Sequence, residues 1–243
     1  TYTLTKYVPE TVISLIAIVV LGMIPGLGGI IGTGDFKKAS QVRGEVFTLT
    51  WLIVTVIGAC ILLWNRPFLT LWVGSDRYAG SLANLLVVIV VAQFVMIRTD
   101  ASIIDLTLRI QRKVVLGAVS VMVSIITSCI LVGWLHMGIV GVCIGLIAGR
   151  LILTFAYPSI VSRYLGVSMV NQLKNMVRPV VTMALIFAGT FLIDLFMKPL
   201  QLSGIVGWGI LVVGAGLSAV LLLVLTFYTG LTANQRNNTL ARI

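Results

Sequence analysis

Seven long apolar stretches follow one another along the chain, separated by short segments that hold most of the charged residues. Each is roughly 20 residues long or longer, the length at which an α-helix crosses the hydrocarbon core of a bilayer. They lack the alternation of apolar and polar positions that a barrel strand needs, so they predict helices. The pattern therefore predicts an all-α integral membrane protein with about seven transmembrane helices. The stretches cover residues 11–31, 46–64, 82–107, 114–135, 138–160, 179–197 and 204–228.

The composition supports a membrane location. Hydrophobic residues make up 59% of the 243 residues and charged residues only 10%, with a mean hydropathy of +1.12. A soluble domain has about 25% charged residues, so lipid must cover much of this surface. The net charge of +10 could indicate nucleic-acid binding, but the basic residues lie in short loops between apolar stretches. Membrane topology explains that distribution better.

Lysine and arginine are unevenly divided between the two sides of the predicted bundle. The side that includes the C-terminal tail holds 11 of them and the opposite side holds 4, while Arg98 and Arg150 lie within spans. The positive-inside rule then places the C-terminus in the cytoplasm and the N-terminus outside. An external start is natural if at least one span precedes residue 1. We therefore expect the chain to be the C-terminal part of a longer transporter-like protein.

The first apolar stretch ends in the glycine-rich sequence LGMIPGLGGIIGTGDFKK. Its spacing fits neither a Walker loop, because Asp35 stands where a lysine is needed, nor a dinucleotide loop, because Ile31 replaces the third glycine. Proline kinks a helix, and the glycine pairs 22/26 and 28/32 would let another helix approach closely. Packing alone and a role in gating both remain open. The candidate hinge residues are Pro25, Gly26 and Gly29.

The fifth stretch contains a glycine every four residues, followed by an arginine. Gly141, Gly145 and Gly149 predict a flat ridge for tight helix packing. Arg150 follows at about the middle of the span, where an arginine costs at least about 2.5–3.5 kcal/mol on insertion scales. It is expected to face the protein interior or a wet cavity. It is either a functional cation or half of a structural ion pair with Asp100 or Asp105.

Charged residues also enter the third stretch, in the segment IVVAQFVMIRTDASIIDLTLRIQRK at 89–113. On a helix Arg98, Asp105 and Arg109 share one side, and Asp100 lies on nearly the opposite side. In one interpretation Arg98 snorkels to the inner interface and Asp105 pairs with Arg109. In the other, these residues line the inner vestibule of a transport path for an anionic substrate. The candidate substrate-binding residues are Arg98, Asp100, Asp105, Arg109 and Arg150.

No arrangement of residues typical of catalysis emerges, so we expect a protein that is not an enzyme. Cys60, Cys129 and Cys143 lie in apolar stretches without ligand spacing, which supports neither disulfides nor a metal site. No cofactor is expected.

Near the outer ends of the predicted spans, Asp194 and Lys198 are spaced for an interfacial pair. Tryptophans there predict an aromatic belt and lie at positions 64, 72, 134 and 208.

Several motifs resemble polysaccharide flippases of the multidrug/oligosaccharidyl-lipid/polysaccharide exporter superfamily. A span containing Pro25 is followed by Gly32-Thr33-Gly34-Asp35-Phe36-Lys37-Lys38 at the predicted cytoplasmic face. Trp72-Val73-Gly74 follows the second span, and Gly138-Ile139-Val140-Gly141 opens the fifth after a tight turn. The resemblance covers roughly residues 10–165. The last two spans fit in number and position.

This resemblance implies a fourteen-helix fold of two six-helix lobes plus two further helices. Residues 1–165 would be the second lobe, and residues 166–243 the two terminal helices with a cytoplasmic tail. Such proteins are O-antigen or related transporters in the bacterial inner membrane, serving lipopolysaccharide and other polysaccharide biosynthesis. They flip undecaprenyl-pyrophosphate-linked oligosaccharides outward by alternating access. The resemblance further implies an N-terminal lobe as partner and cations lining the cavity, for which Arg98 and Arg150 are candidates by residue type and depth.

Two other functions remain open at this point. A multidrug or cation antiporter of the same fold would favour buried carboxylates over buried arginines. A membrane-embedded polysaccharide polymerase or ligase would need large external loops, whereas the longest one predicted here is about 65–81.

Overall fold

The computed structural model describes residues 6–7, 9–11, 22, 24–74, 78–106, 110–196, 202–232 and 236, except the side chains of 169–173 and 175. Within these residues it contains helices and no strands. Six helices are long and apolar enough to cross a membrane. The prediction of an all-α, multi-pass membrane protein with about seven helices is thus confirmed. The helices are α2 (Phe36–Val73), α3 (Ser81–Leu106), α4 (Gln111–Gly133), α5 (Gly138–Leu165), α6 (Met169–Phe196) and α7 (Gly204–Gly230).

Before α2 the chain is helical over residues 24–32, within the predicted first span 11–31. Most of the rest of that span lies outside the described residues. A Cβ added to Gly28 would lie 3.2 Å from the Leu106 side chain of α3, which is a close approach. At Gly22, Gly26 and Gly32 no described residue lies within 4 Å of such a Cβ. Of the two glycine pairs, therefore, only Gly28 lies at a close helix contact.

The helices extend beyond the predicted spans. α2 begins at Phe36, ten residues before the predicted start, and its N-cap Asp35 accepts a hydrogen bond of 3.0 Å from the backbone N–H of Lys38. It then continues through Pro67 into the predicted outer loop. With 38 residues at about 1.5 Å each it is longer than a bilayer core of roughly 30 Å. Apolar runs thus mark where a helix meets lipid, whereas the helix itself continues into water.

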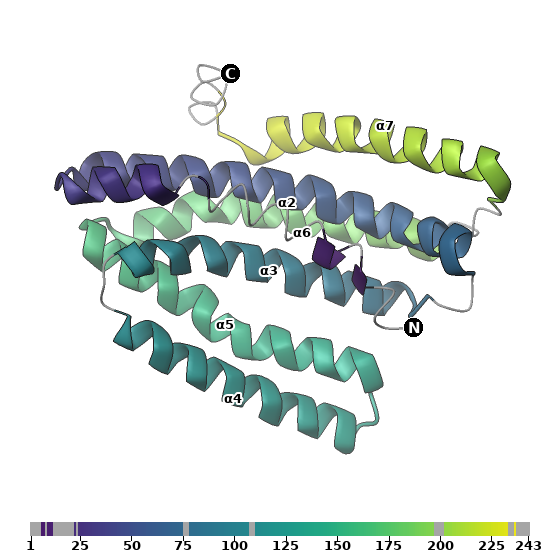
Figure 1. The fold of residues 1–243 in the computed structure, drawn as a ribbon, viewed down its shortest axis with the longest axis horizontal. Coiled ribbons are helices and arrows are strands. Elements are labelled where there is room, and N and C mark those ends of the chain that lie inside the picture. The colour runs from purple at the N-terminus through teal and green to yellow at the C-terminus, as the bar shows by residue number, and fades with distance from the viewer. Residues whose placement is uncertain are drawn as a thin grey trace.

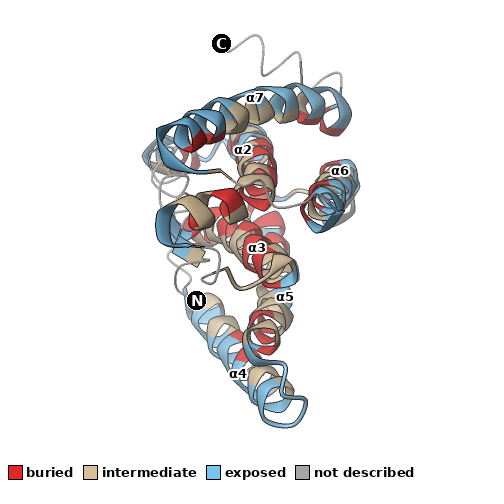
Figure 2. Ribbon diagram, turned by 90° about the vertical axis from the view of Figure 1, so that its right-hand side faces the viewer, coloured by how far each residue is buried: buried red, intermediate tan, exposed pale blue. Residues whose placement is uncertain are grey.

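The six helices run side by side along the long axis of the molecule (Figure 1). α3 lies between α2 and α5, α4 packs on the outer side of α5, and α7 lies along α2. Buried residues concentrate on α2 and α3, whereas α4 and α7 are largely exposed (Figure 2). In a protein that crosses a bilayer, such exposed apolar faces contact lipid. The main core joins α2, α3 and α6 around Leu62, Val88, Val95 and Phe187.

The predicted glycine ridge is confirmed at the contact between α4 and α5. A Cβ added to Gly145 or Gly149 would collide with Ser124 or Ser128 on α4, and one on Gly141 would lie 3.1 Å from the Cβ of Leu131. The hydroxyl of Ser120 donates a 2.9 Å hydrogen bond to the carbonyl oxygen of Gly149. Serines spaced every four residues on α4 therefore face glycines with the same spacing on α5.

The outer tryptophans divide into two groups. Trp72, Trp134 and Trp208 are exposed, as an aromatic belt requires. Trp64 instead packs against Gly214 of α7, and its indole N–H donates a 3.1 Å hydrogen bond to the hydroxyl of Ser218. It therefore joins α7 to α2.

Candidate functional site

Charged residues inside the spans come together around α3. At about 100° of rotation per helical residue, Arg98 and Asp100 project from nearly opposite sides of this helix. Their surroundings differ accordingly: Arg98 lies over the ring of Phe94 on α3 itself, whereas Asp100 meets α2.

Arg98 and Arg150 meet at one aromatic ring. The central guanidinium carbon of Arg150 lies 5.3 Å from the ring centroid of Phe94, and that of Arg98 lies 5.9 Å from the same centroid. Arg150 also donates a 2.9 Å hydrogen bond from Nη1 to the carbonyl oxygen of Val90. We call Phe94, Arg98 and Arg150 the arginine site. It joins α3 to α5 through cation–π contacts.

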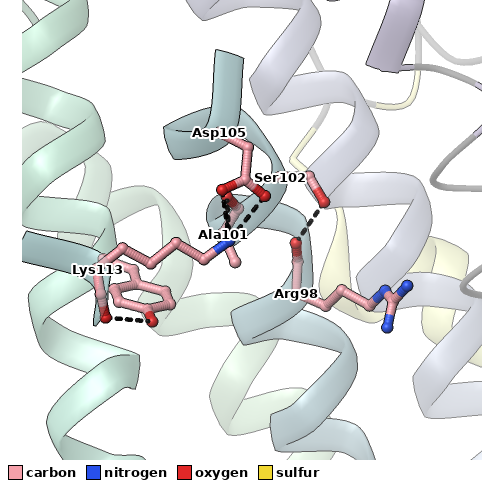
Figure 3. Close-up of polar contacts among 6 residues, drawn as sticks. Arg98, Ala101, Ser102, Asp105 and Lys113 are labelled. Atoms are coloured by element: carbon pink, nitrogen blue, oxygen red, sulfur yellow. Dashed lines mark hydrogen bonds and ion pairs between the residues drawn. The ribbon is translucent and has the colours of Figure 1, made fainter. Parts of the chain in front are cut away.

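The side chain of Arg98 turns away from Asp105. A long side chain on a helix leans toward the helix N-terminus, and here it reaches Phe94 one turn earlier. Its guanidinium points away from Asp105 and Lys113 (Figure 3). Its buried Nε has no hydrogen-bond acceptor among the described residues. Arg98 thus retains donor capacity for another group.

Asp100 is held by an arginine that the sequence analysis did not select. Arg43 of α2 donates hydrogen bonds of 2.8 Å from Nε and 2.7 Å from Nη2 to Oδ1 of Asp100. Both residues are buried, with 7% of Arg43 and 2% of Asp100 exposed. Arg43 lies between the predicted spans 11–31 and 46–64, although α2 puts it on the same face as the buried residues Ala39, Val46 and Thr50. Extending the helical pattern to Phe36 would have placed it there.

Asp105 pairs with a lysine at the start of α4. Lys113 Nζ lies 2.6 Å from Oδ1 and 2.7 Å from Oδ2 of Asp105, and also donates a 3.2 Å hydrogen bond to the carbonyl oxygen of Ala101 (Figure 3). Arg109, the partner suggested by the sequence, lies outside the described residues. In the structure, therefore, Asp100 pairs with Arg43 and Asp105 pairs with Lys113. The sequence had suggested these two aspartates as possible partners of Arg150.

A cavity of about 490 Å³ lies among α2, α3, α5 and α6. Its wall is almost entirely apolar, with polar groups from Gln93, Asp100 and Thr154. Gln93 donates hydrogen bonds from Nε2 to the Thr154 hydroxyl at 3.2 Å and to the Ile147 carbonyl oxygen at 3.4 Å. Its buried Oε1 has no partner among the described residues. Of the candidate residues, Asp100 lines this cavity, whereas Arg98 and Arg150 do not.

The candidate hinge residues Pro25, Gly26 and Gly29 lie on the helical segment 24–32 and are all exposed. No described residue lies within 4 Å of a Cβ added to Gly26 or Gly29. None of the three lines the cavity or contributes to the arginine site. Their role as a hinge stays a prediction.

Outside these sites, a polar cluster forms near the opposite end of the bundle. Tyr78 donates a 3.2 Å hydrogen bond to Oδ2 of Asp194, while Lys198 lies outside the described residues. Burial and the neighbouring Asp194 carboxylate raise the pKa of Tyr78, so the phenol stays protonated as a donor. Arg66 lies over the Tyr78 ring at 5.8 Å. This cluster fastens the segment after α2 to α6.

The described residues contain no cluster of three or more histidine, cysteine, aspartate or glutamate side chains that could hold a metal ion. Comparisons with protein-family models, with curated proteins and with solved structures find no match. The sites described above therefore carry the functional argument.

Proposed function

We propose that this membrane protein translocates an anionic lipid-linked saccharide, with the arginine site attracting its diphosphate. The observation that carries the proposal is the convergence of two arginines, from α3 and α5, on Phe94 within the membrane-spanning region. Each arginine at this depth is costly, by about 2.5–3.5 kcal/mol at least. Such residues generally line passages for substrates or ions.

The chemistry of the arginine site suits a phosphate group. Guanidinium groups recognise phosphate oxygens through paired charge-assisted hydrogen bonds. Asp100 and Asp105 are engaged by Arg43 and Lys113, and Arg98 retains a buried donor atom that no described residue uses. The low dielectric of the surroundings strengthens attraction to a negatively charged ligand.

The proposed setting is the bacterial cytoplasmic membrane. The starts of α2, α4 and α6 lie together at one end of the bundle (Figure 1), and these segments carry many of the basic residues. By the positive-inside rule this end and the C-terminus would face the cytoplasm. The substrate would be an undecaprenyl-pyrophosphate-linked oligosaccharide that enters from the inner side. Translocation would proceed by alternating access, as these helices and an N-terminal lobe move relative to each other.

Binding of undecaprenyl diphosphate tests this proposal. In the protein held in detergent, the Arg98→Gln/Arg150→Gln double substitution should weaken binding at least about tenfold, because charge-assisted hydrogen bonds to phosphate are lost. Arg236→Gln is the control, since Arg236 also lies over an aromatic ring, that of Tyr228 at 5.6 Å, but beyond the last span. Affinity in the double variant equal to that of the control would exclude the arginine site as the diphosphate site.

A multidrug or cation antiporter is the second candidate. The large cavity favours it, because a mostly apolar wall with methionine and aromatic side chains and one carboxylate suits lipophilic cations. Asp100 would then exchange its partner Arg43 for a cation or a proton. Binding of a lipophilic cation that is lost in Asp100→Asn and retained in Arg98→Gln/Arg150→Gln would favour this candidate over the first.

A further inference from the structure

A second hollow lies on the outside of the bundle, between the first turns of α4 and the last turns of α5. It is an open groove of about 550 Å³. One end is polar, with Gln111, Arg112 and Arg163, and the wall below is apolar. We call it the α4–α5 groove. Its lining residues are Gln111, Arg112, Val115, Leu116, Ala156, Ser159, Ile160 and Arg163.

The two arginines of the groove carry uncompensated positive charge. Both are exposed, and neither forms an ion pair with a described residue. The adjacent Lys113 differs, because Asp105 neutralises it. Ile110, at the N-cap of α4, provides no side-chain hydrogen bond to the first turn. The polar end of the groove therefore offers hydrogen-bond donors and positive charge with no acidic group to balance them.

The position of these arginines corresponds to the headgroup level of a bilayer. Arg112 is the second residue of α4, and Arg163 lies in the last turn of α5, so both stand at the ends of helices that can cross the membrane. Basic pockets between helices at this level are typical binding sites for phospholipid headgroups.

The apolar wall of the groove continues into a lipid-facing surface. Val115 is 61% exposed, and further along α4 Val119 and Met122 are exposed as well. A free phosphate ion would gain nothing from this surface, whereas acyl chains attached to a phosphate would cover it. Charge and shape together thus favour a molecule with an anionic head and apolar tails.

We infer that the α4–α5 groove binds an anionic phospholipid. The phosphate lies between Arg112 and Arg163, with Gln111 and Ser159 as further hydrogen-bonding groups, and the acyl chains lie along Val115, Ala156 and Ile160. This site is separate from the arginine site and holds a structural lipid instead of the transported one.

Native mass spectrometry of the full chain tests this inference, with dioleoyl-phosphatidylglycerol as the probe and dioleoyl-phosphatidylcholine as its zwitterionic counterpart. We expect the protein to retain phosphatidylglycerol preferentially, and Arg112→Gln/Arg163→Gln to weaken its binding about tenfold or more, removing the preference. The matched control is Lys37→Gln/Lys38→Gln, which removes the same charge from two exposed lysines in the first turn of α2 and should leave the preference intact. An equal loss in the control would overturn the inference, because bulk charge would then explain the preference.

Two further arms separate the possible ligands. Ala156→Phe keeps both arginines but fills the apolar wall, so it should also weaken phosphatidylglycerol binding. Inorganic phosphate at millimolar concentration should not displace the lipid; displacement, or unchanged lipid binding in Ala156→Phe, would indicate an ion site and overturn the lipid assignment. Arg98→Gln/Arg150→Gln should bind phosphatidylglycerol normally, so the result is independent of the proposed transport function.

Discussion

The Arg43–Asp100 pair shows how one residue can change the interpretation of its neighbours. Asp100 projects into a nearly apolar cavity, where an unpaired carboxylate would be very costly. Two hydrogen bonds from Arg43 compensate that cost and join α2 to α3 at the same time. With Asp100 engaged in this way, Arg98 keeps a buried donor atom that no described residue uses.

Separating this pair should destabilise the protein more than removing both charges. Asp100→Leu or Arg43→Met alone leaves a buried charge without its partner, for which we expect a loss of about 3–5 kcal/mol in the free energy of unfolding. Arg43→Met combined with Asp100→Leu should recover much of that loss. Unfolding by titration with sodium dodecyl sulfate measures all three variants. Additive losses in the double variant would mean that the two side chains are not coupled.

Arg43 also shows which charged residues can be singled out from the sequence and which cannot. Arg98 and Arg150 stand out because their neighbours in sequence are apolar. Arg43 lies among polar residues at the edge of an apolar run, so the pattern gives it no special position. Its partner Asp100 is 57 residues away, and only the packing of α2 on α3 brings the two together. A long-range partner of this kind does not follow from helical periodicity.

At the scale of helices, small residues determine where pairs approach closely. Where the sequence places glycines every four residues on α5, the structure places serines with the same spacing on α4. The glycine half of this contact was predictable, because the spacing forms a stripe on one helix face. The identity of the opposing helix was not, since other helices also carry small residues.

The α4–α5 contact should therefore be sensitive to one added methyl group. Gly145→Ala places a Cβ against Ser128 and the backbone of α4, so we expect lower stability in dodecyl sulfate titration. Gly117→Ala is the control on α4, where no described residue lies within 4 Å of the new Cβ. It should be neutral or stabilising by up to about 1 kcal/mol through helix propensity. Equal effects in both variants would show that α4 and α5 do not pack closely at Gly145.

At the scale of the whole molecule, helix number and class follow from the apolar pattern, whereas helix ends do not. The pattern records contact with lipid, and α2, α5 and α6 continue beyond it into polar segments. The cavity among four helices was likewise beyond sequence reasoning, because its volume depends on how side chains from separate helices pack. The charged residues within the spans could be recognised from the sequence, and they indicate α3 and α5 as the helices of a candidate site.

Translocation itself provides the most direct test of the central claim that Arg98 and Arg150 guide an anionic lipid-linked saccharide across the membrane. The full-length natural protein would be reconstituted in liposomes. The bilayer would contain a fluorescent undecaprenyl-diphosphate saccharide, and the outer solution an impermeant quencher. We predict that Arg98→Gln/Arg150→Gln lowers the translocation rate at least about a hundredfold at unchanged protein content, since two charge-assisted contacts are lost, while Arg236→Gln translocates normally. Translocation by the double variant at the rate of the unsubstituted protein would contradict the claim.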